Sequence, residues 1–192
     1  AKALIDRGLT LAEEVPLPRR VQQAGILYAH LGQHHLRLRE YDKAAEAFLH
    51  AAQSTKKWAA YMASARRRDN VEVTESRLVG ILNNLANTYR LAGRLEDARE
   101  QYQEALSYIK KGGTRSRSEA SLYSGLGEID LQQKRFPEAL EQFRRALAVA
   151  EQQQSPALIS AANRRMGDLY RMTNRPSEAI PYYQTAIQQT ET

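Results

Sequence analysis

Cysteine is absent from the 192-residue chain, which excludes disulfide bonds and thiolate metal sites. Proline occurs only 6 times and β-branched runs are scarce, so little in the chain opposes helix formation. No apolar run approaches the roughly 18–20 residues that span a bilayer. Asp6, Glu13 and Glu14 lie where a signal peptide would need apolar residues. We therefore expect a cytoplasmic protein that does not enter a membrane, and the absence of an initial Met indicates a piece of a larger protein.

The residues that are abundant favour an all-α fold. Hydrophobic residues make up 42% of the chain and charged residues 26%, a balance compatible with a folded protein. The mean hydropathy of −0.62 suits an elongated array, which exposes more surface per residue than a compact domain. Ala, Leu, Arg, Glu and Gln dominate, and all are good helix formers. The net charge of +6 weakly favours acidic partners.

Four segments share one internal pattern. In each, a small residue is followed by alanine 12 positions later, an aromatic residue 16 positions later and a second alanine 19 positions later. The four sets are Gly32, Ala44, Phe48 and Ala51; Ala86, Ala98, Tyr102 and Ala105; Gly127, Ala139, Phe143 and Ala146; and Gly167, Ala179, Tyr183 and Ala186. The last three residues of a set form one apolar stripe of a helix. The small residue allows a preceding helix to approach closely, and the aromatic ring fills the gap between the two helices.

These positions, together with Leu31, Leu85, Leu126 and Met166 directly before the small residues, resemble the tetratricopeptide repeat family, whose pattern is W-x2-L-G-x2-Y…A-x3-F…P. The resemblance implies a right-handed superhelix of antiparallel helix pairs that serves as a protein-binding scaffold without catalytic activity. The departures are at the Trp position, occupied by Tyr28, Leu82, Tyr123 and Asn163, and at the Tyr position, where His35 and Asp130 replace Tyr in two repeats.

The small residues are spaced by 54, 41 and 40 positions, more than the about 34 of the common repeat. Spacings near 40 resemble the long repeats of kinesin light chains and of spindle-orientation adaptors. We divide a single array into the second helix of a preceding repeat (3–16), repeat 1 with an extended second helix (18–70), repeat 2 (72–113), repeat 3 (115–154) and repeat 4 (155–192). No polar capping helix is recognisable, so the terminal helices could also mediate self-association.

The extra residues of the first repeat follow its second helix. Trp58, Tyr61 and Met62 recur at helical spacing, which favours a continuous helix that ends near a break at Asp69-Asn70. The pattern leaves open whether residues 54–70 continue that helix or form a separate one.

The resemblance also implies a binding groove, because the first helix of each pair lines the inner surface in this family. Asn can pair with a peptide backbone and Arg with carboxylates, so an extended or helical segment with acidic residues is the implied ligand. The implied groove residues are Ala29, His30, Gln33 and Arg37; Asn83, Asn84, Asn87 and Arg90; Ser121, Ser124, Glu128 and Gln132; and Arg164, Arg165, Asp168 and Arg171. These positions could equally be ordinary solvent-facing polar residues.

Other patterns in the sequence favour ordinary structural interpretations over functional ones. His30 and His34 lie one helical turn apart, yet no carboxylate or Cys nearby completes a metal site, so we expect no metal and no cofactor. Lys110-Lys111-Gly112-Gly113 lacks phosphate-loop spacing and is typical of a helix end. The three consecutive arginines at 66–68 support an alternative hypothesis, in which the chain is a sensor region of a multidomain regulator and contacts nucleic acid. We do not expect nucleic acid as the main partner. No catalytic constellation is recognisable, so we predict that the chain is not an enzyme.

Overall fold

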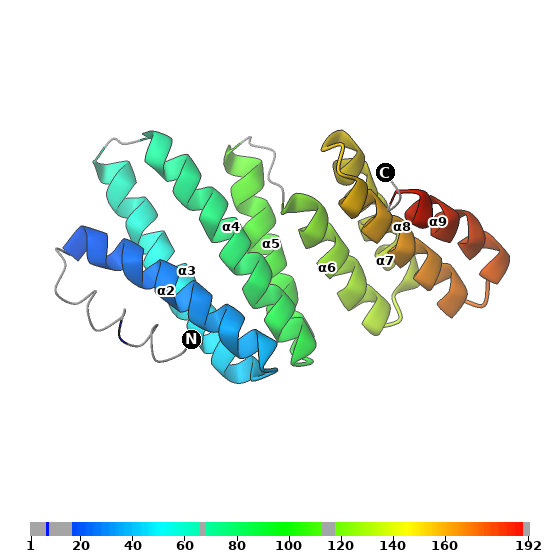
Figure 1. The fold of residues 1–192 in the computed structure, drawn as a ribbon, viewed down its shortest axis with the longest axis horizontal. Helices are drawn as coiled ribbons and strands as arrows, with labels where there is room; N and C mark the ends of the chain where they lie inside the picture. The colour runs from blue at the N-terminus through cyan, green and yellow to red at the C-terminus, as the bar shows by residue number, and fades with distance from the viewer. Residues whose placement is uncertain (1–6, 8–16, 66–67, 113–117, 190–192) are drawn as a thin grey trace. The chain divides into compact units, whose positions relative to one another are not determined.

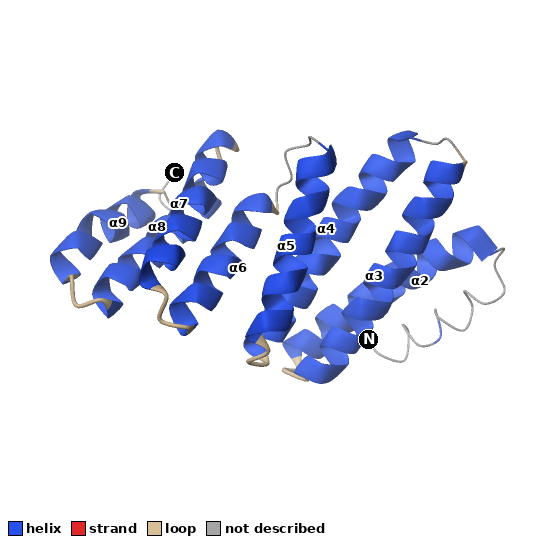
Figure 2. Cartoon of the chain, turned by 180° about the vertical axis from the view of Figure 1, so that it is seen from behind, coloured by secondary structure: helices blue, strands red, loops and turns tan. Residues whose placement is uncertain are grey.

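The computed structural model describes residues 7, 17–65, 68–112 and 118–189, and the secondary structure of this part of the chain is helical (Figures 1 and 2). The helices are α2 (Leu17–Arg37), α3 (Tyr41–Ser64), α4 (Arg68–Leu91), α5 (Leu95–Gly112), α6 (Glu119–Gln132), α7 (Phe136–Gln152), α8 (Pro156–Met172) and α9 (Pro176–Gln188). The predicted all-α architecture of helix pairs is confirmed. The helix predicted for residues 3–16 lies outside the described residues, apart from residue 7.

The chain divides into two compact units, Ala1–Thr114 and Arg115–Thr192. In the first unit α2 packs on α3, α3 on α4 and α4 on α5; in the second, α6 packs on α7, α7 on α8 and α8 on α9. We call α2, α4, α6 and α8 the A helices, and α3, α5, α7 and α9 the B helices. Each unit therefore contains two A–B pairs.

The long first spacing is explained by an unbroken helix. Helix α3 continues to Ser64 without interruption, which decides the question that the sequence left open for the residues around Trp58. The predicted break at Asp69-Asn70 is wrong, because α4 already begins at Arg68. Neither glycine nor proline marks the junction, so no strong local signal placed the boundary.

The core includes the repeated alanines and three of the four repeated aromatic rings, together with buried leucine and isoleucine side chains. Phe48, Phe143 and the alanines beside them are fully buried, and Tyr102 is 2% exposed. A Cβ atom on Gly32 would lie 2.7 Å from the Phe48 ring, and one on Gly167 would lie 2.8 Å from the Tyr183 ring. The predicted close approach of A and B helices at the small residue is confirmed.

Each A–B turn uses the same backbone motif. One residue adopts the left-handed conformation, with φ between 58° and 80°, namely Arg39, Gly93, Lys134 and Asn174. The amide of the next residue then donates to a carbonyl five positions back, as from Arg94 to Tyr89 at 2.9 Å. This Schellman geometry satisfies the last carbonyls of the A helix and starts the B helix directly. As a result, the residues five apart across each turn lie close together.

Candidate functional site

The A helices form the more tightly packed layer of each unit. Cα atoms of α2 and α4 lie within 8 Å of each other, as do those of α6 and α8. No such approach occurs between α3 and α5 or between α7 and α9, and the ion pair from Lys56 to Glu104 at 2.6 Å shows that α3 and α5 meet through long side chains. When one layer is closer than the other, the stack curves toward the closer layer. This difference makes the A helices the candidates for the inner side of each unit.

Two predicted groove residues of the second unit join neighbouring A helices. Glu128 of α6 forms an ion pair with Arg165 of α8, and their side chains are 12% and 34% exposed. Ser121 and Ser124 lie on the same helix as Glu128 and are half-buried. The resemblance placed Glu128 and Arg165 in different repeats, and the fold brings them into contact.

Asp168 is the centre of a second polar contact. Its Oδ1 atom accepts a hydrogen bond of 2.8 Å from the Tyr183 hydroxyl, and its Oδ2 atom lies 3.7 Å from Arg164. Burial raises the pKa of Tyr183, and the hydrogen bond to Asp168 raises it further. Sequence reasoning assigned Tyr183 only to the core. Its hydroxyl extends from α9 to Asp168 on α8 and orients the Asp168 carboxylate, while Arg171 on α8 remains exposed.

The first unit presents amides on α4. Asn83, Asn84, Asn87 and Arg90 are each half-buried. Arg90 donates a hydrogen bond of 2.8 Å to the Asn87 side-chain oxygen, a bond that does not use the donor capacity of the Asn87 amide nitrogen. The structure thus brings two of the predicted residues together as a fixed pair.

The α2 residues of the predicted groove are the most exposed. His30, Gln33 and Arg37 all face solvent, whereas Ala29 is half-buried. Gln132, at the end of α6, is also exposed. The predicted groove residues of α2 and α4 belong to the first unit, and those of α6 and α8 belong to the second.

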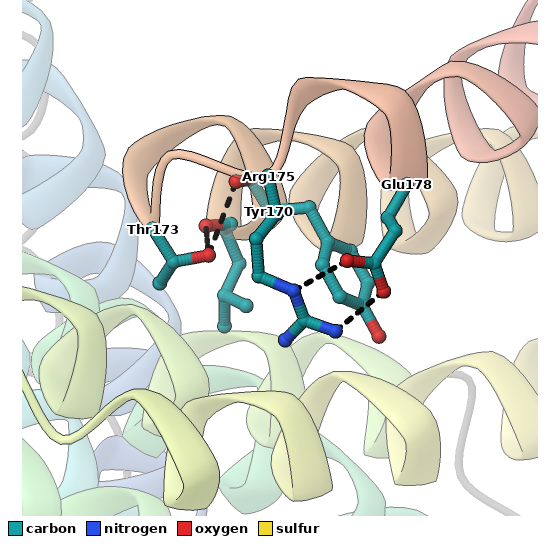
Figure 3. Close-up of polar contacts among 5 residues, drawn as sticks. Tyr170, Thr173, Arg175 and Glu178 are labelled. Carbon is teal, nitrogen blue, oxygen red and sulfur yellow. Dashed lines mark hydrogen bonds and ion pairs between the residues drawn. The ribbon is translucent and has the colours of Figure 1, made fainter.

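The Tyr position of the repeat has a structural role that the sequence did not reveal. In the α8–α9 turn the Arg175 guanidinium lies 4.9 Å from the centre of the Tyr170 ring and pairs with Glu178 (Figure 3). The α4–α5 turn repeats this arrangement, with Arg94 4.3 Å from the Tyr89 ring. Each arginine bridges the end of one helix and the first turn of the next.

Where the Tyr position holds another residue, the partner five positions later completes a different pair. Asp130 accepts a hydrogen bond of 2.8 Å from Arg135, and His35 pairs with Glu40. Glu40 also accepts a hydrogen bond from Lys43, and this bond, followed by that with His35, lowers the pKa of Glu40 to about 2. The four turns therefore share one backbone geometry and use three kinds of side-chain pair: Tyr–Arg, Asp–Arg and His–Glu. The signal in the sequence is the pairing of residues five apart.

The alternative patterns gain no further support in the described part of the chain. No group of three or more potential metal-ligating side chains was found there, and His35 is paired with Glu40. Helix α5 ends at Gly112, as the interpretation of the lysine–glycine stretch required. Residues 66 and 67 lie outside the described residues, so the contact of the basic run with nucleic acid stays a prediction. Among the described residues, no helix is long and apolar enough to cross a membrane.

Comparison with solved structures finds a similarity that extends over the whole chain. The crystal structure of BtubC (BKLC) from P. vanneervenii is 25% identical and superposes with a TM-score of 0.77 over 100% of this chain and 72% of that one. Two structures of MamA are 13% and 14% identical, with TM-scores of 0.48 and 0.49; they cover 88% and 84% of this chain and 93% and 95% of theirs. Those TM-scores are too low to support a conclusion.

Comparison with protein families is decisive. No curated protein matches the chain. The family model described as tetratricopeptide repeat matches residues 77–152 and again residues 118–192, which together are more than half of the chain. The predicted family is confirmed, whereas its long-repeat subclass stays a prediction. The chain belongs to the tetratricopeptide repeat family.

Proposed function

We propose that the A helices of each unit bind an extended segment of a partner protein. The family supports a repeat scaffold for protein interaction. The observation that carries the proposal is the closer approach of α2 to α4 and of α6 to α8 than of their B-helix counterparts. That approach makes the A helices the inner side, where one extended ligand can contact two helices at once. We call the predicted residues on this side the A-helix face: His30, Gln33, Arg37, Asn83, Asn84, Asn87 and Arg90 in the first unit, and Ser121, Ser124, Glu128, Arg164, Arg165, Asp168 and Arg171 in the second.

In the first unit, side-chain amides supply the contacts. A peptide in extended conformation presents unpaired N–H and C=O groups, and an Asn side chain can both donate and accept. Asn87 is held by Arg90, so its amide is oriented before a ligand arrives. A side chain that is already held in its binding orientation loses less conformational entropy when the ligand binds.

In the second unit, charge supplies the contacts. The Arg164 side chain is 53% exposed, and its distance of 3.7 Å from Asp168 is long for an ion pair. A ligand carboxylate could therefore take a closer position on Arg164 while Tyr183 keeps Asp168 in place. With the net charge of +6, this favours a partner segment with acidic residues.

Photo-crosslinking tests the proposal directly. Benzoylphenylalanine placed at Asn83 or Ser124 should crosslink a partner segment in an extract of the cells that express the protein. Mass spectrometry would identify that segment. The same amino acid at Gln103 or Arg144, exposed on the B helices α5 and α7, serves as the control. Equal yields of the same crosslink from both faces would contradict binding on the A-helix face.

The identified segment then allows a quantitative test. Asn87→Ala and Arg164→Ala should each weaken binding of the synthetic segment by about tenfold, because one charge-assisted or oriented contact contributes about 1.5 kcal/mol. Calorimetry measures the affinity and circular dichroism checks that melting is unchanged. Gln103→Ala is the matched control. Unchanged affinity in both face variants would refute the assignment of these residues.

A further inference from the structure

A pocket lies at the end of the first unit where three helices meet. It has a volume of about 240 Å³. Helix α2 contributes Arg19 and Gln22, α3 contributes Trp58 and Met62, and α4 contributes Val73 and Arg77. None of these residues belongs to the A-helix face.

The extension of α3 creates this pocket. Trp58 and Met62 lie 26 and 30 positions after Gly32. The equivalent helices end sooner, α5 at Gly112, which is 26 positions after Ala86, and α7 at Gln152. Met62 therefore lies beyond the level at which α5 and α7 end, whereas Trp58 is level with the last residue of α5. The pocket is a feature of this chain and not of the repeat pattern.

The pocket combines an apolar floor with a basic rim. Trp58 and Met62 are 8% and 4% exposed, and Trp58 stacks on Tyr61 with ring centres 5.5 Å apart. Val73 is 61% exposed, a large apolar side chain left in solvent. Burying such a surface against a partner side chain is favourable.

Arg19 and Arg77 carry the charge of the rim. Both are exposed, and neither has an acidic partner among the residues that the structure describes. Two guanidinium groups that line the same pocket as an apolar surface complement a carboxylate attached close to an apolar side chain. The volume decides between classes of ligand, because pockets for whole small molecules measure about 300–1,000 Å³. The space of this one suits a single side chain.

We propose that this pocket anchors a partner peptide by one aliphatic side chain, seated on Trp58 and Met62, while carboxylates of the neighbouring peptide residues pair with Arg19 and Arg77. The pocket lies on the same A helices but uses none of the residues named for the A-helix face. A partner could occupy it with or without occupying that face, so the two proposals stand or fall separately.

The chain contains a single tryptophan, so the emission of Trp58 reports on the pocket alone. The probe is the peptide Gly-Ser-Asp-Leu-Glu-Ser-Gly, titrated into the full chain under selective tryptophan excitation. We expect a saturable change in Trp58 emission. The peptide with Ala in place of Leu tests the apolar contact, and the peptide with Asn and Gln in place of Asp and Glu tests the charges. Both should bind at least about fivefold more weakly.

Variants of the protein complete the test. Arg19→Gln and Arg77→Gln should each weaken the peptide by about fivefold, the upper range for exposed ion pairs. Arg144→Gln on α7 should not, and neither should Asn87→Ala on the A-helix face. Because both pocket arginines are exposed, circular dichroism should show unchanged folding.

Three results would overturn the proposal. The first is the absence of a saturable change at peptide concentrations up to about 1 mM. The second is equal binding of the acidic and the amide peptides, or of wild type and the Arg19→Gln, Arg77→Gln double variant. The third is a saturable change with oligothymidylate but none with the acidic peptide, which would assign the pocket to single-stranded nucleic acid.

Discussion

The Cβ atom that Gly127 lacks would lie 2.5 Å from Cε1 of Phe143, well inside van der Waals contact. Phe143 is fully buried, so its ring has no free space into which to move. The second repeat solves the same problem with Ala86 opposite Tyr102, both buried. The spacing between the paired helices is therefore set separately in each repeat by the small residue and the ring.

This contact predicts opposite effects of alanine at two glycines. Gly127→Ala should lower the free energy of unfolding by about 1–2 kcal/mol, since overpacking costs about 1–3 kcal/mol and helix propensity returns at most about 1. Gly80→Ala on α4 has open space within 4 Å and should be stabilising by about 0.5–1 kcal/mol. Urea denaturation followed by circular dichroism measures both. A stabilising Gly127→Ala would show that the Phe143 ring yields easily.

The left-handed turn residues predict a second pair of effects. Lys134 has a φ of 58° and Gly93 a φ of 80° in equivalent turns. A side chain in this conformation costs about 1–2 kcal/mol. Lys134→Gly should therefore be stabilising by about 0.5–1 kcal/mol, after the entropy gained by the unfolded chain is subtracted, and Gly93→Ala should be destabilising by about 1 kcal/mol. Thermal melts of the two variants give the comparison; a less stable Lys134→Gly would contradict the assigned turn geometry.

The pair across the α6–α7 turn should be worth more than its aromatic counterparts. Asp130 is 2% exposed, so Arg135→Ala removes a cation from a buried carboxylate and should cost about 2–3 kcal/mol. Arg94→Ala removes a cation from above the Tyr89 ring and should cost only about 0.5–1 kcal/mol. Urea denaturation of both variants tests the ranking. Arg144→Ala serves as the control for removal of an exposed arginine. An equal loss of unfolding free energy in all three variants would refute the predicted ranking.

Glu40 gives the α2–α3 turn a dependence on pH. Its pKa is about 2 in the folded chain and near 4.5 when unfolded, because Lys43 and then His35 stabilise its charge. A group with a depressed folded pKa stabilises the fold above its unfolded pKa and loses that contribution as pH falls toward the folded value. The melting temperature of wild type should exceed that of Glu40→Gln at pH 6, and the difference should shrink between pH 4.5 and pH 2. A difference independent of pH would show that the carboxylate charge plays no part.

Much of the fold could be predicted because it depends on the local periodicity of apolar residues. Offsets of 12, 16 and 19 positions locate the stripe of Ala139, Phe143 and Ala146, and burial of such a stripe is what drives helices to pair. The boundary between α3 and α4 was misplaced, because no glycine or proline marks it. The A-helix face stays a prediction from the family resemblance, and the coordinates add the contacts among its residues.

The sequence by itself determined the repeat, the helical class and the residues of the core, since each depends on spacings of less than one helix pair. Only the tertiary structure decided which polar residues meet. Asp130 is compatible with burial because the turn brings Arg135 to it, Asp168 is oriented by a hydroxyl from the next helix, and Trp58 forms a pocket floor because α2 and α4 pack around the end of a helix that is longer than its counterparts. The contact across the turn has a signal in the sequence, the pairing of residues five apart, whereas the contacts of Asp168 and Trp58 depend on the packing of separate helices, which no local pattern encodes.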